Sequence, residues 1–107
     1  MTPQRRFELE YAPIVRSHLQ AIETKYYSLI RKTIEEQLLF EPDVETKNRK
    51  TLKRPVDFGA QWELRFGPDN RFRVFYKINY ETMHVNILAI GEKRGDRLIV
   101  GGEAVRL

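Results

Sequence analysis

A period-two alternation of apolar and charged residues recurs through the second half of the chain and constrains the fold more than any other feature. It predicts strands over residues 61–66, 71–79 and 83–90 and a short last strand over 97–100, because successive side chains of a strand point to opposite faces of a sheet. The connections are short and rich in turn formers, as in the Gly-Pro-Asp-Asn run at 67–70. Strands joined in this way pair antiparallel. Both faces of the third strand are apolar, which indicates a central place in the sheet.

The first part of the chain predicts one strand followed by helices. Residues 6–11 alternate apolar and charged side chains, as a half-buried strand does. Over about 13–40 the apolar residues recur three or four apart, and Thr24 is a candidate cap for a second helix. The expected fold class is α+β, with a single domain over residues 1–107. In it, the N-terminal strand and a helical hairpin pack on one face of a twisted antiparallel sheet of about four strands.

Composition narrows the class of protein. The chain has no cysteine and no apolar run near the ~20 residues that cross a bilayer. Its first residues lead into no apolar signal segment. We therefore expect a cytoplasmic protein without disulfides, without a thiolate metal site and without membrane association.

The charge is unevenly distributed between the two parts of the chain. Residues 1–46 hold six Lys and Arg against eight Asp and Glu, for a net charge of −2, whereas residues 47–107 hold thirteen against seven, for a net charge of +6. A basic region of this kind suits a polyanion. Excess charge that only keeps a small protein soluble is the alternative. Within the basic part, residues 41–60 have no clear period and are expected to form a long loop with one turn around 50–53. Its cations are Lys47, Arg49, Lys50, Lys53 and Arg54.

The predicted sheet has one face for the helices and one for a charged ligand. The apolar side chains of the alternation belong with the helices, and cationic side chains with Phe75 among them project to the other face. Cations for phosphates and a ring for an unstacked base suit RNA. A solvated face with ion pairs to Glu63 and Glu92 is the alternative. The expected members of the cationic face are Arg65, Arg71, Arg73, Lys77, Lys93, Arg94 and Arg97, and the basic loop could fold over them.

Other chemistries have little support in the sequence. His18 lies on the apolar stripe of a helix and is typical of a packed histidine, while His84 stands alone on a strand. Two isolated histidines form neither a metal site nor a catalytic dyad. Gly91, Lys93 and Gly95 do not have the spacing of a nucleotide-binding loop. No metal and no cofactor is expected.

Several runs in the sheet region together resemble the RelE/ParE superfamily. They are Trp62-Glu63-Leu64-Arg65, Arg71-Phe72-Arg73-Val74-Phe75-Tyr76 and Ile87-Leu88-Ala89-Ile90-Gly91-Glu92-Lys93-Arg94, preceded by Lys50-Thr51-Leu52. The resemblance covers about residues 6–105. It implies a twisted antiparallel sheet with two helices on one side. It also implies a toxin that is held inactive by the flexible segment of a cognate antitoxin. RelE-like members cut mRNA in the ribosome, and ParE-like members poison DNA gyrase.

The resemblance also implies roles for single residues. Arg73 matches the central-strand arginine that contacts the scissile phosphate, Arg94 matches the arginine that helps to hold it, and Arg65 lies at a commonly basic position. The chain departs from the pattern where RelE has two lysines on the second sheet strand, since Gln61 and Glu63 stand there. The C-terminal tyrosine that stacks on the substrate base is replaced by Ile99 or Val100.

The function expected from these residues is that of a ribosome-dependent mRNA endoribonuclease that inhibits translation. Arg73, Arg94 and Arg65 are the expected catalytic residues. The pKa of an arginine is too high for a base, so Glu63 is a candidate base, and Lys50, Lys53 or Lys93 is the alternative if its surroundings favour the neutral amine. A gyrase inhibitor or a catalytically decayed binding module is the alternative. The expected partners are an antitoxin, the ribosome and mRNA. The expected RNA-binding residues are Lys47, Arg49, Lys50, Lys53, Arg54, Arg71, Phe75, Lys77, Lys93 and Arg97.

Overall fold

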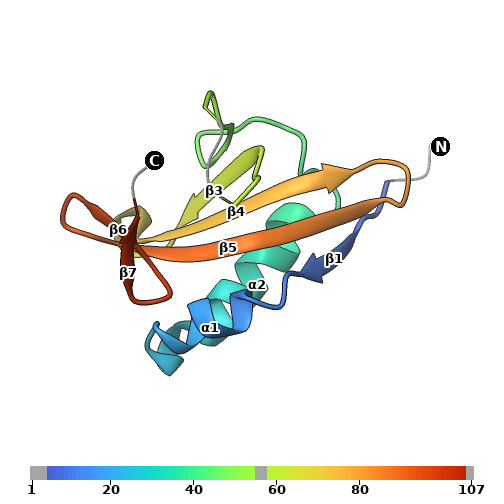
Figure 1. The fold of residues 1–107 in the computed structure, drawn as a ribbon. Helices are drawn as coiled ribbons and strands as arrows, with labels where there is room; N and C mark the ends of the chain where they lie inside the picture. Colours follow the sequence, from blue (N-terminus) through green and yellow to red (C-terminus); the bar gives the residue numbers. More distant parts are fainter. Residues whose placement is uncertain (1–4, 55–57, 106–107) are drawn as a thin grey trace.

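A seven-stranded sheet with helices on one side forms the framework of the protein (Figure 1). This computed structural model describes residues 5–54 and 58–105. Along its main path the strands lie in the order β2-β3-β4-β5-β6-β7, and β1 pairs with β5 beside that path. The strands are β1 (Glu8–Tyr11), β2 (Arg49–Thr51), β3 (Trp62–Phe66), β4 (Phe72–Asn79), β5 (His84–Arg94), β6 (Arg97–Val100) and β7 (Glu103–Val105).

Strand β5 is the centre of the sheet, as the sequence predicts. One of its edges pairs antiparallel with β4 over residues 84–92, with a register shift next to Phe75 and Tyr76. The other edge is shared, because β1 pairs with residues 84–87 and β6 pairs with residues 91–94. The four strands predicted from the alternation pair antiparallel, as expected. The N-terminal strand β1, which was expected to pack on a face of the sheet with the helices, instead joins the sheet parallel to β5. A period of two assigns side chains to faces, but it carries no information about the direction of a neighbouring strand.

The helices cover one face of the sheet. Helix α1 (Val15–Gln20), the 3-10 turn η1 (Thr24–Tyr26) and α2 (Tyr27–Leu38) lie below the strands in Figure 1, as the resemblance implied. Ile30, Ile34 and Leu38 recur at intervals of four and face the sheet from α2. They pack there against the apolar side chains of the strands, among which Leu64, Phe72, Val74, Tyr76, Val85 and Ile87 are fully buried. None of the described helices is both long and apolar enough to span a membrane.

The sheet has seven strands and not about four, and two of the additional strands are very short. Strand β2 lies inside the segment expected to be a loop, and β7 follows the strand over 97–100 that was expected to be the last. Three residues are too few to show a period. Strand β5 also continues through Gly91–Arg94, beyond residue 90, where the alternation predicts its end. The cationic residues of this run are therefore held on a strand and not on a loop.

The face away from the helices is partly apolar, whereas the alternation predicts a face of cations with Phe75 exposed among them. Phe75 is fully buried there and packs with Ala89 and Val100 in a second, smaller core. The ring of Phe58 covers it, with 5.3 Å between the ring centroids. The apolar outer side of the central strand was the signal for such a cover. Phe75 is consequently a packing residue in this fold, and its ring has no face open to a base.

Candidate nucleic-acid interface

Glu63, Arg65 and Arg73 form one charged cluster on the outer face of the sheet. Arg65 and Arg73 are register partners across β3 and β4, and Glu63 lies two residues before Arg65 on the same face. The Glu63 Oε1 atom accepts a hydrogen bond from Arg65 Nε at 2.6 Å. The Oε2 atom lies 3.6 Å from Arg73 Nη1 and accepts no hydrogen bond from the described residues. The carboxylate is thus held between two guanidinium groups.

The two arginines of this cluster differ in their exposure. The Arg65 side chain is 45% exposed, whereas those of Arg73 and Glu63 are 9% and 5% exposed. Burial lowers the pKa of Arg73, the charge of Arg65 lowers it further, and Glu63 acts in the opposite direction. Arg73 Nε also donates to the Asn70 carbonyl at 3.2 Å. Arg73 is therefore part of the protein's interior as well as of the cluster, and it is not the fully solvated side chain that the alternation suggested.

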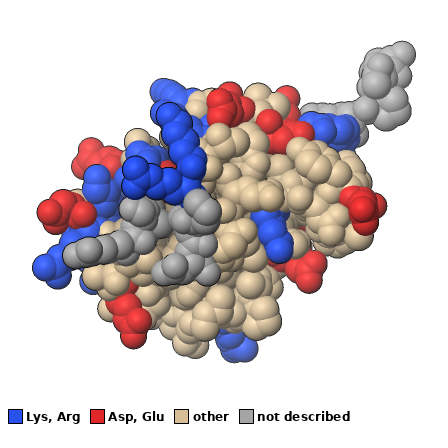
Figure 2. All heavy atoms as spheres, turned by 45° about the horizontal axis from the view of Figure 1, so that its top comes forward, with Lys and Arg blue, Asp and Glu red and all other residues tan. Residues whose placement is uncertain are grey.

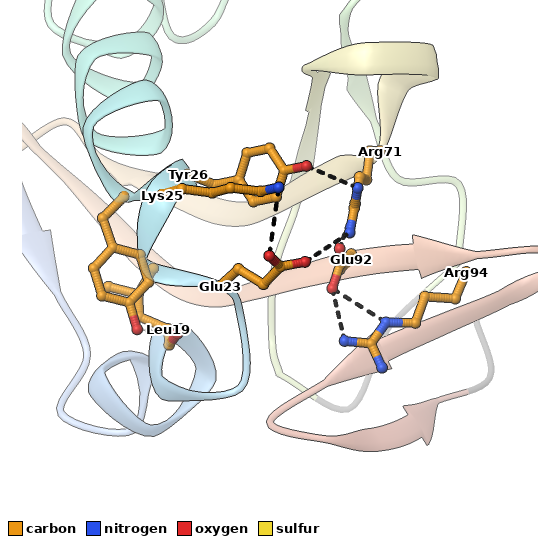
Figure 3. Close-up of polar contacts among 8 residues, drawn as sticks. Leu19, Glu23, Lys25, Tyr26, Arg71, Glu92 and Arg94 are labelled. Carbon is orange, nitrogen blue, oxygen red and sulfur yellow. Dashed lines mark hydrogen bonds and ion pairs between the residues drawn. The ribbon is translucent and has the colours of Figure 1, made fainter.

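A second cluster lies on the helix side of the sheet, around the buried carboxylate of Glu92 (Figure 3). Arg71 Nε donates to one oxygen of Glu92, and Arg94 donates to the other from Nε and Nη2 at 3.2 and 3.0 Å. Arg71 Nη1 also donates to the Tyr26 hydroxyl at 3.0 Å, and its guanidinium lies 4.8 Å from the centre of that ring. Glu23 lies 3.9 Å from Arg71 Nη2. Tyr26 and Glu23 precede α2, and no pattern in the sequence pointed to them.

The structure does not bring Arg94 and Arg71 together with Arg73. Across β4 and β5, Arg73 is the register partner of Gly91 and Phe72 that of Glu92, so Glu92 and Arg94 share the helix side with Phe72. Arg71 lies before the first residue of β4 and turns to the same side, where it contacts Tyr26. The expectation that all of these arginines share one outer face was therefore wrong. They form two clusters separated by the thickness of the sheet.

The basic loop contributes surface cations and one buried arginine. Lys47, Lys50, Lys53 and Arg54 are exposed. Lys50 is the register partner of Glu63 and so lies on the outer face beside the first cluster. Arg49 faces the other way and is buried, and its Nη1 atom donates to the Gln37 carbonyl at the end of α2 at 2.6 Å. Arg49 therefore joins β2 to α2 and presents no free charge to a ligand.

The remaining expected residues lie at the strand ends. Lys77, Lys93 and Arg97 are exposed, and their register partners are Asn86, Leu98 and Arg94. Of the two positions that replace the family's tyrosine, Val100 is buried in the second core and Ile99 is half-buried.

Positive charge is gathered on part of the surface. Figure 2 shows a cluster of Lys and Arg toward the upper left of the view with a few Asp and Glu around it, and separate cationic side chains elsewhere on this face. Within residues 5–54 and 58–105 no set of three His, Cys, Asp or Glu side chains is arranged to hold a metal ion.

Comparison with known proteins supports the fold. No family model and no curated protein matches this chain. Among solved structures, a chain of the toxin–antitoxin complex RelBE2 from Mycobacterium tuberculosis matches with a TM-score of 0.61. The match has 17% sequence identity and covers 82% of this chain and 99% of that chain. At this identity the likeness shows the fold, and the RelE-like α+β architecture that the sequence implied is confirmed.

Proposed function

We propose that this chain is the toxin of a toxin–antitoxin pair and acts as a ribosome-dependent endoribonuclease that cleaves mRNA and so inhibits translation. The observation that carries the proposal is the outer cluster, in which a carboxylate lies between two guanidinium groups. The fold shared with a chain of the RelBE2 complex supports it and suggests an antitoxin as the partner.

The outer cluster of Glu63, Arg65 and Arg73, together with Lys50 beside it, provides a group for each part of an RNA cleavage. Glu63 takes the proton of the 2′-hydroxyl, whose oxygen attacks the neighbouring phosphorus. Arg65 and Arg73 stabilise the negative charge that builds on the phosphate oxygens. The bond to the 5′-oxygen breaks, and this oxygen takes a proton from the Lys50 ammonium. The products are a 2′,3′-cyclic phosphate and a 5′-hydroxyl end.

Access to Glu63 depends on Arg65 in this scheme. The Oε2 atom is buried, and it has the capacity to accept a hydrogen bond that the described residues do not use. The Arg65 side chain is nearly half exposed, so it is free to turn toward a phosphate and uncover the carboxylate. Arg73 stays in place because its burial and its bond to Asn70 fix it.

The test is induced expression of the chain alone, with growth and primer extension on cellular mRNA followed together. We expect growth arrest with new cuts that depend on translation. The cuts should disappear in Glu63→Gln and become much weaker in Arg65→Ala, and they should persist in Arg31→Ala. Arg31 is the matched control because it is exposed on α2 and pairs only with Glu35 among the described residues.

Folding of the variants must be measured, because Arg73 and Glu63 are buried. Arg73→Lys keeps the charge and is preferable to Arg73→Ala, which removes a buried partner of Glu63. If a variant has the melting temperature of the wild type and still cuts mRNA, the substituted residue has no part in the mechanism. Growth arrest with intact mRNA would contradict cleavage and point to another target such as gyrase. If growth does not stop, the remaining interpretation is a binding module without catalytic activity.

A further inference from the structure

Asn48 joins the short edge strand β2 to β3 just before the first residue of β2. The Arg65 amide donates to the Asn48 carbonyl at 2.8 Å, and Asn48 Nδ2 donates to the Arg65 carbonyl at 2.8 Å. In an antiparallel ladder two main-chain amides make such an exchange. The main-chain amide of Asn48 instead donates to Thr46 Oγ1 at 3.1 Å. The side-chain amide of Asn48 therefore takes the place of a main-chain donor in the ladder.

This contact fixes the place of Lys50 on the outer face. Strand β2 has three residues, and its pairing puts Lys50 opposite Glu63. Asn48 secures the ladder on one side of this pair. On the other side the Leu52 amide donates to the Gln61 carbonyl at 2.9 Å. Among the described residues β2 pairs with β3 alone, so the register of Lys50 depends on these two ends.

We propose that Asn48 is a positioning residue for RNA cleavage and keeps the Lys50 ammonium within reach of the 5′-oxygen that leaves. The inference rests on the proposed function, in which Lys50 protonates this oxygen and Glu63 takes the proton of the 2′-hydroxyl. A proton donor must lie within hydrogen-bond reach of the leaving oxygen. Lysine carries its charge on a long, flexible stem, so the place of its strand decides where the ammonium is available.

The other groups of the proposed site do not depend on β2 in the same way. Glu63 and Arg65 on β3 are paired with β4, which carries Arg73, through a five-residue ladder. Arg49 also anchors β2, but its contact is to α2 on the helix side and does not set the register with β3. Loss of the Asn48 side chain therefore moves the proton donor relative to the base and the arginines.

The test compares two leaving groups in mRNA cleavage by the purified protein on programmed ribosomes. One mRNA has the ordinary 5′-oxygen at the cut position, and the other has sulfur at this bridging position. In both, Glu63 takes the proton of the 2′-hydroxyl, the 2′-oxygen attacks phosphorus and the bond to the bridging atom breaks. A thiol has a pKa of about 8.5, so the sulfur leaves as a thiolate and needs no proton from Lys50.

We expect Asn48→Ala to lower the single-turnover rate on the oxygen mRNA by about ten- to a hundredfold, as a displacement of about 1 Å does. The protein concentration that gives half of the maximal rate should not change. On the sulfur mRNA both Asn48→Ala and Lys50→Ala should recover most of the wild-type rate, while Glu63→Gln stays slow on both. Adding Asn48→Ala to Lys50→Ala should cause no further loss, because both act on the same step.

Asn79→Ala is the matched control for the loss of an asparagine that binds the main chain. Asn79 Oδ1 accepts hydrogen bonds from the amides of Glu81 and Thr82 at 3.0 and 3.2 Å. It is the last residue of β4, at the opposite end of this strand from Arg73. Asn79→Ala should cut both mRNAs at the wild-type rate.

Thr46 provides a second pair of variants, which keeps the test decisive where Asn48→Ala does not fold. Its Oγ1 atom accepts the amides of Asn48 and Arg49 at 3.1 and 3.0 Å and so holds the turn from which Asn48 reaches β3. Thr46→Ser keeps the hydroxyl and should keep the rate. Thr46→Ala should be slow on the oxygen mRNA and recover on the sulfur mRNA.

Two results would overturn this inference and leave cleavage standing. The first is an equal loss of rate on both mRNAs in folded Asn48→Ala and Thr46→Ala proteins, which is the result of a purely structural role. The second is a wild-type rate of Lys50→Ala on the oxygen mRNA, because the group that Asn48 positions would then have no part in the reaction. If the wild type cuts neither mRNA, the proposed function fails and this inference fails with it.

Discussion

Arg49 and Lys50 are neighbours on β2, yet their side chains have different functions. Arg49 is buried and hydrogen-bonded to Gln37, while Lys50 is exposed on the outer face. We expect Arg49→Ala to destabilise the fold by about 1–3 kcal/mol, because it leaves a carbonyl without its donor. Lys50→Ala should change stability by less than about 0.5 kcal/mol and weaken RNA binding. Urea unfolding and oligouridylate binding on both variants test this, and the reverse result would contradict the assignment of faces.

His18 makes the stability of the fold dependent on pH. It is buried on α1, and its Nδ1 atom accepts a hydrogen bond from the Ile90 amide at 3.3 Å. Burial lowers the pKa of His18 from the ordinary value of 6.5. Near and below pH 6.5 the unfolded chain therefore binds more protons than the folded one. The stability that neutral His18 contributes is complete above that pH and is lost as the pH falls toward the folded pKa.

The His18 effect is measurable against a matched variant. We expect the urea midpoint to fall between pH 7.5 and pH 5.5 in the wild type, and to fall less in His18→Gln, whose side chain does not titrate. The other titrating groups are the same in both proteins, so their contribution cancels in the comparison. Equal pH dependence of the two proteins would show that His18 does not carry the effect.

At the scale of elements, the turn between β3 and β4 depends on Gly67. Its φ is +84°, and a Cβ there would lie 2.7 Å from Cδ2 of Phe72, a core residue. We expect Gly67→Ala to lose roughly 1–3 kcal/mol through overpacking in addition to its backbone strain. Gly59→Ala is the control, because φ is +75° there and no described residue beyond its chain neighbours lies within 4 Å of the added Cβ. Thermal unfolding of both variants should show a clearly larger loss for Gly67→Ala.

The sequence predicts the elements in which a spacing repeats over many residues. It does not predict the three-residue strands or the partners of individual side chains. Strands β3, β4 and β5 and the helices follow from repeated spacing over many residues. The burial of Arg49 depends on where α2 ends, and the position of Arg71 depends on Tyr26, 45 residues away. Such contacts are tertiary, and no local spacing encodes them. The sequence analysis placed Arg94 on the same face as Arg73 for a related reason. The faces of these two residues depend on the register between β4 and β5, which local spacing does not give.

At the scale of the whole molecule, β5 connects the two parts of the sheet with each other and with helix α1. It pairs with β4, β1 and β6, and α1 packs against it through His18. Strand β7 pairs only with β6 and is mostly exposed. We therefore expect amides in the middle of β4 and β5 to exchange with solvent only through global unfolding, and those of β7 to exchange through local opening.

Hydrogen exchange followed by NMR tests this order and bears on both charged clusters. Arg73 is the second residue of β4 and Arg94 is the last residue of β5, so we expect their amides to be less protected than those in the middle of these strands. Protection of β5 no greater than that of β7 would contradict this view. In that case β5 would open as readily as the edge of the sheet and would not be the fixed support of the two clusters.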